Sequence, residues 1–63
     1  MKPEERHERN YDRIVTAQAA MGAVQSDMAR MLHTGRVNRG VVDRMVKHLN
    51  SAADDLANLD TTT

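Results

Sequence analysis

The stretch TAQAAMGAVQSDMARML (residues 16–32) decides the fold of this 63-residue chain. Its apolar residues recur at steps of three and four, which is the period of one face of an α-helix. They are also small, because alanine, glycine and serine alternate with methionine and the chain has no phenylalanine or tryptophan. Small side chains let two helices approach closely, and methionine fills the irregular space that remains. The stretch therefore predicts a helix that packs tightly against other helices.

The same spacing extends over most of the chain and forms two apolar seams. Both step by 3, 4, 3, 4 and 3 residues, the spacing of a coiled-coil seam: Ile14, Ala17, Met21, Val24, Met28 and Met31, then Val42, Met45, Leu49, Ala52, Leu56 and Leu59. Folded antiparallel, with residue 31 opposite 42, the seams match member for member, and each small residue meets a large one. The sequence predicts an all-α protein, an antiparallel two-helix hairpin.

Capping residues set the expected limits of the helices. Pro3 suits the first turn of a helix, Gly35 suits the left-handed position after a helix, and Asn38 suits an N-cap. We expect a single domain with helices at about 3–33 and 39–59, a turn at 34–38 and a frayed tail at 60–63. The first dozen residues overhang the second helix, so they are expected either to fray or to act as a docking arm.

A hairpin of this size encloses a line of contacts rather than a core, and its stability is marginal. A second copy would supply the missing layer, so we expect a homodimer that forms a four-helix bundle. The predicted self-association face is a stripe of small residues on the first helix: Val15, Ala19, Gly22, Ser26 and Ala29. A glycine inside a helix costs about 1 kcal/mol against alanine, and close packing would explain it. The alternative is that these residues are an ordinary helix surface.

The charges cancel in total, with nine basic and nine acidic residues, but they are unevenly placed. Residues 28–50 hold five cations against Asp43 alone, whereas residues 51–63 hold three aspartates and no lysine or arginine. A candidate anion or partner contact lies near the start of the second helix, at Arg36, Arg39 and Arg44. The alternative is a solvated basic turn. Asp27 is expected opposite His48, unless His48 points to solvent.

The sequence gives no sign of catalytic chemistry. It has no cysteine, its three histidines are scattered along the predicted hairpin, and it has no glycine-rich phosphate loop. We therefore expect no catalytic, metal or cofactor-binding residues, and no enzyme. No apolar run approaches the roughly 20 residues of a membrane span, and the charged N-terminus does not resemble a signal peptide. We expect no membrane partner and a cytoplasmic location.

The expected function is that of a small non-enzymatic interaction protein. It would associate with itself and bind another, unidentified protein through helix packing, as an adaptor, co-chaperone or inhibitor. The alternative is a nucleic-acid-associated regulator that uses the basic turns of a dimer, although the zero net charge and the lack of a recognition motif count against it. The layout resembles that of short helical-hairpin proteins such as secretion co-chaperones and phage-encoded inhibitors. Such similarity of architecture does not fix function.

Overall fold

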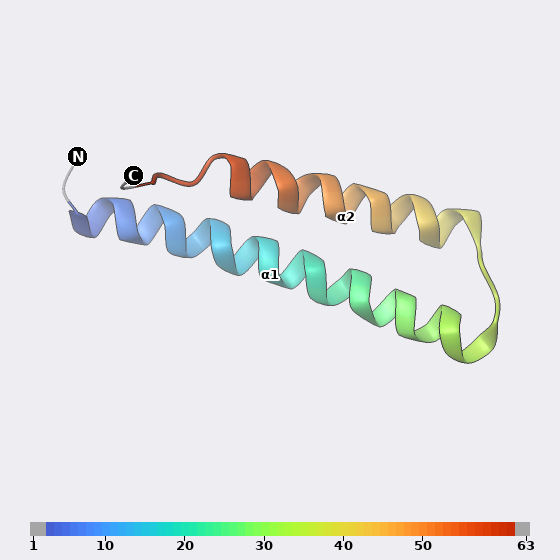
Figure 1. Ribbon diagram of the computed structural model, residues 1–63. Helices are drawn as coiled ribbons and strands as arrows, with labels where there is room; N and C mark the ends of the chain where they lie inside the picture. The colour runs from blue at the N-terminus through green and yellow to red at the C-terminus, as the bar shows by residue number, and fades with distance from the viewer. Residues whose placement is uncertain (1–2, 62–63) are drawn as a thin grey trace.

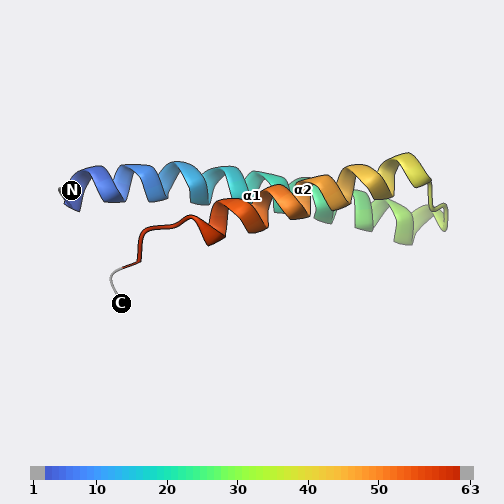
Figure 2. The same ribbon diagram turned by 90° about the horizontal axis from the view of Figure 1, so that it is seen from above.

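The computed structural model describes residues 3–61, and all its regular structure there is helical: α1 spans Pro3–Thr34 and α2 spans Arg39–Ala57. The helices run antiparallel along one another, so the start of α1 and the end of α2 lie at the same end of the molecule, here called the open end (Figures 1 and 2). The opposite end is the turn end. The predicted all-α hairpin of two packed helices is confirmed. Residues 1–2 of the predicted arm and 62–63 of the predicted tail lie outside the described residues.

The turn forms where the sequence places its capping residues. Gly35 adopts a left-handed φ of 71°, and its N–H donates to the Met31 carbonyl at 2.8 Å, which closes the last turn of α1. At the start of α2, Asn38 Oδ1 accepts hydrogen bonds from the N–H groups of Gly40 at 2.7 Å and Val41 at 3.4 Å. These two amides have no partner within the helix, so the asparagine side chain satisfies them.

The open end is more ordered than the sequence indicates. The α2 helix ends at Ala57 rather than at about residue 59, because Asn58 leaves the helix and its side-chain N–H₂ donates back to the Asp54 carbonyl at 2.7 Å. Beyond it, Asn10 Nδ2 donates to the Asp60 carbonyl at 2.9 Å, and the Asp60 N–H donates to Asn10 Oδ1 at 3.0 Å. This reciprocal pair fastens Asp60, the first residue of the predicted frayed tail, to α1.

The contact between the helices uses one half of each predicted seam. Within it, Ala17, Val24, Met45 and Ala52 are buried, and Met31, Val42 and Leu59 are half-buried. The other half of the seam is exposed, with 38 to 52% of each residue accessible: Ile14, Met21, Met28, Leu49 and Leu56. The predicted seam is therefore covered only in part, because five of its twelve residues keep a large share of their surface accessible.

The contact is rotated toward the residues one position earlier in each helix. In place of the five exposed seam residues, the contact includes these neighbours: half-buried Arg13, Ala20, His48 and Asp55, and buried Asp27. The apolar stripe of a helix is wider than a single neighbouring helix can cover, so one edge of it must stay open. The covered edge is the one where Ala20 allows close approach and where Asp27 reaches an ion-pair partner on α2.

Candidate interaction surfaces

The exposed half of the two seams forms one continuous apolar face. An antiparallel helix pair has an approximate two-fold axis perpendicular to its plane, so equivalent seam positions of the two helices lie on the same side of the hairpin. We call this surface the apolar face, and it consists of Ile14, Met21, Met28, Val46, Leu49 and Leu56. Tyr11, which is 60% exposed, and Leu32, which is 87% exposed, continue it toward the two ends of α1. Contiguous apolar surface of this kind marks interaction sites in soluble proteins.

The apolar face ends in a hollow at the turn end. The hollow measures about 400 Å³ and is lined by Met28, Met31, Leu32, Gly35 and Val37. Two of these side chains, Leu32 and Val37, are largely exposed, although both are apolar. The left-handed turn at Gly35 places Val37 opposite the last turns of α1, which creates the hollow. An apolar side chain of a partner could be received there.

The predicted self-association stripe lies on the edge of α1 that faces away from α2. All five of its residues are exposed. A methyl group added at Gly22 would have no neighbouring heavy atom within 4 Å beyond the adjoining helix backbone, so nothing within the hairpin requires glycine there. Self-association through this stripe stays a prediction.

Replacing Gly22 by alanine is expected to stabilise the hairpin by about 0.5–1 kcal/mol, because alanine loses less backbone entropy in a helix. Gly35→Ala is the matched control and should destabilise by about 1–2 kcal/mol, since its φ of 71° strains a residue with a Cβ. Urea denaturation of both variants measures the two effects. Destabilisation by Gly22→Ala would show that another chain packs closely on the stripe.

A buried carboxylate lies on the side of the hairpin away from the apolar face. Asp27 is 5% exposed, and Arg44 Nη2 from α2 lies 3.1 Å from its Oδ1 and 3.2 Å from its Oδ2. Arg30 Nη1 lies 3.9 Å from Oδ1 of the same carboxylate. The expected pairing of Asp27 with His48 is therefore wrong. The long arginine reaches the carboxylate from one turn closer to the turn end, and a guanidinium is a stronger partner than an imidazole because it is always charged.

The structure does not gather the three predicted anion-binding arginines at the start of α2. Arg44 is directed to Asp27, and Arg39 pairs with Asp43 at 3.4 Å. The first amides of α2 are already bonded to the Asn38 side chain. The Arg44–Asp27 pair joins residues on different helices, so the sequence pattern could not show it before the register of the hairpin was known.

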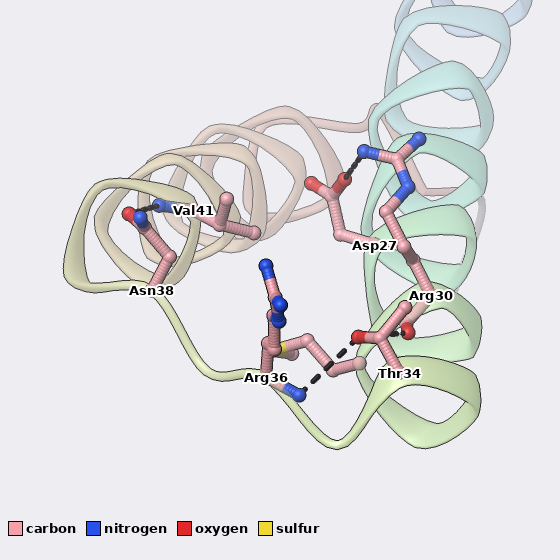
Figure 3. A pocket seen from close by; sticks show the side chains of 7 residues that line it. Asp27, Arg30, Thr34, Arg36, Asn38 and Val41 are labelled. Carbon is pink, nitrogen blue, oxygen red and sulfur yellow. Dashed lines mark hydrogen bonds and ion pairs between the residues drawn. The ribbon is translucent and has the colours of Figure 1, made fainter.

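Arg36 lies apart from the other two and faces a second hollow of about 200 Å³ between the helix ends. Figure 3 shows its side chain pointing into the gap between Asn38 on one side and Arg30 on the other. The turn is held there by Thr34, whose hydroxyl donates to the Arg30 carbonyl at 2.9 Å and accepts from the Arg36 N–H at 3.2 Å. Buried Asp27 and half-buried Met31 and Val41 also line this hollow.

Residues 3–61 hold neither a metal site nor a membrane span. No group of three histidine, cysteine, aspartate or glutamate side chains in that range is placed to hold a metal ion. Neither of the two described helices has the length and apolarity needed to cross a membrane. Comparison with protein-family models gave no match, and no curated protein or solved structure matched the chain significantly.

Proposed function

We propose that this chain is a non-enzymatic interaction protein, which associates with itself into a four-helix bundle and binds another protein by helix packing. The observation that supports the proposal is the apolar face. Among residues 5–61, four apolar residues are buried, whereas the six residues of the apolar face are each 38 to 52% exposed on one side of the hairpin. Burying such side chains against a partner releases about 25 cal/mol for each Å² of apolar surface. An adaptor, a co-chaperone or an inhibitor would all use a surface of this type.

The overall dimensions support a missing layer of protein. The radius of gyration is 15.0 Å, against about 11 Å for a compact domain of this length. The accessible surface is 5123 Å², whereas a folded monomer of 7.1 kDa typically exposes about 4,100 Å². The excess of about 1,000 Å² is close to the roughly 800 Å² that each partner buries in a standard protein interface.

The basic turn gives less support to the nucleic-acid alternative. Arg39 and Arg44 each lie within 4 Å of an aspartate, and pairing of this kind offsets their attraction for phosphate. The largest exposed side chains of the apolar face are aliphatic or thioether groups, which match helix packing better than a phosphate backbone. Binding to duplex DNA with a steep dependence on salt would instead favour the alternative.

Sedimentation equilibrium at micromolar concentration is expected to show a species heavier than the 7.1 kDa chain. Met21→Glu should convert it to monomer, because a charge in the middle of the apolar face would be buried without a partner. Ser26→Glu is the matched control, since Ser26 is exposed on the same helix but lies on the stripe of small residues. A monomer at every concentration contradicts self-association. Loss of the assembly in Ser26→Glu but not in Met21→Glu would show that the contact lies on the stripe of small residues.

A further inference from the structure

The apolar-face residues of α1 are spaced symmetrically about Met21, so two antiparallel copies of this helix can pair them. Ile14 precedes Met21 by seven residues and Met28 follows it by seven. When a second α1 is laid antiparallel over the first, with Met21 meeting Met21, each Ile14 lies over a Met28. The ends match too, because Tyr11 then comes over Leu32, whose hollow is open to solvent.

Tyr11 is suited to that hollow. It is the only aromatic residue of the chain, it is 60% exposed, and its ring centroid lies 6.4 Å from that of His7, one turn earlier on α1. An aromatic ring that is supported on one side loses little freedom when it enters a pocket, and such rings dominate the binding energy of many interfaces. The hollow of about 400 Å³ is lined mainly by methionine, leucine and valine.

Charge selects the same arrangement. The turn end carries five cations, Arg30, Arg36, Arg39, Arg44 and Lys47, against Asp27 and Asp43, which leaves a net charge of +3. At the open end, residues 3–13 and 51–61 carry three arginines against seven carboxylates, which leaves a net charge of −4. Two hairpins can stack face to face about a two-fold axis that runs along them, which puts turn end on turn end. They can also stack about an axis across them, which puts each basic turn end on an acidic open end. Like charges brought together are destabilising, so the second arrangement is favoured.

We infer that a second copy of this chain covers the apolar face, about a two-fold axis that crosses the hairpin near Met21, with Tyr11 of each copy in the turn-end hollow of the other. The inference rests on the proposed self-association and specifies its geometry. In this assembly α1 packs over α1 and α2 over α2, all neighbouring helices are antiparallel, and Arg39 of one copy approaches Asp60 of the other. The excess surface of about 1,000 Å² is large enough to supply the roughly 800 Å² that each partner buries in a standard interface.

Cysteine cross-linking tests the position of the axis, because the natural chain has no cysteine. Met21→Cys should form a disulfide-linked dimer under mild oxidation, since residue 21 meets its own copy at the axis. Leu32→Cys is the control: it is more exposed, at 87%, yet it lies far from the axis and should remain unlinked at low protein concentration. The double variant Tyr11→Cys/Leu32→Cys should be linked between chains, because these residues are roughly 30 Å apart within one helix.

Each outcome of the cross-linking is decisive. Linking of Met21→Cys without linking of Leu32→Cys supports the arrangement. Equal linking of Met21→Cys and Leu32→Cys overturns the arrangement. Linking of Met21→Cys only to a chain that carries Leu49→Cys also overturns it, but in that case the protein still associates with itself. A heavy species in sedimentation whose mass is unchanged in Met21→Glu overturns the use of this face, whereas a monomer at all concentrations overturns the proposed function as well.

Tyr11→Ala gives an independent measurement of the same contact. It should weaken the dimer about tenfold or more, and Leu32→Ala should add little further loss once Tyr11 is absent, because the two side chains would act on one another. The helicity of both single variants should stay at the wild-type level, since neither residue packs between α1 and α2. Fully additive effects, or an unchanged dimer in Tyr11→Ala, would overturn the placement of Tyr11.

Discussion

Val24→Asp is expected to unfold the protein at 25 °C. Val24 is 2% exposed and is the largest fully buried side chain of the hairpin. An aspartate there would be a buried charge without a partner, which costs several kcal/mol. Because a domain of this length has only about 3–9 kcal/mol of stability, the loss exceeds or approaches the whole of it. Circular dichroism should show the helical signal reduced to that of an unfolded chain.

Val15→Asp is the matched control for this substitution. Val15 is on the same helix and is 44% exposed, on the edge that faces away from α2. The same change of residue should therefore leave the helical signal nearly intact and cost only a few tenths of a kcal/mol, mainly through helix propensity. Equal loss of helix in both variants would contradict the contact between α1 and α2 in this structure.

The second large effect concerns the ion pair between buried Asp27 and exposed Arg44. Arg44→Met is expected to destabilise the hairpin by about 1–3 kcal/mol, because it keeps the aliphatic stem but leaves the carboxylate of Asp27 without its main partner. The Arg44 side chain is 53% exposed while that of Asp27 is 7% exposed, so the two halves of the pair are not equivalent. Removing the exposed cation leaves a buried anion, whereas removing the buried anion leaves an arginine that water can solvate.

Asp27→Leu is accordingly expected to be close to neutral, since an apolar residue of similar size needs no partner at a buried position. Urea denaturation at pH 7 compares the two variants directly, and Arg44→Lys should fall between Arg44→Met and the natural chain because it restores the charge without the planar guanidinium. Greater destabilisation by Asp27→Leu than by Arg44→Met would contradict this expectation. It would mean that the ion pair adds net stability, rather than only compensating the cost of a buried carboxylate.

The sequence by itself determined the helices and the turn between them. Proline and glycine have restricted or unusual backbone preferences, and asparagine bonds to the free amides of a helix start, so Gly35 and Asn38 act through the nearest residues of the chain. The spacing of apolar residues likewise required two helices in contact, because both seams have the same length and period. These features depend on local geometry and do not require knowledge of which residues meet across the hairpin.

Only the tertiary structure decided which edge of each apolar stripe is covered. The period of three and four residues fixes the stripe but not the rotation of the helix about its axis, so the sequence placed Met21 and Leu49 between the helices, and the structure places them on an open face. The partner of Asp27 and the bonds between Asn10 and Asp60 join residues far apart in the chain. These contacts form only at one register and one rotation of the two helices. Close approach at Ala20 and charge pairing at Asp27 together set that register and rotation. These contacts between distant residues, rather than any local preference, leave the apolar face exposed.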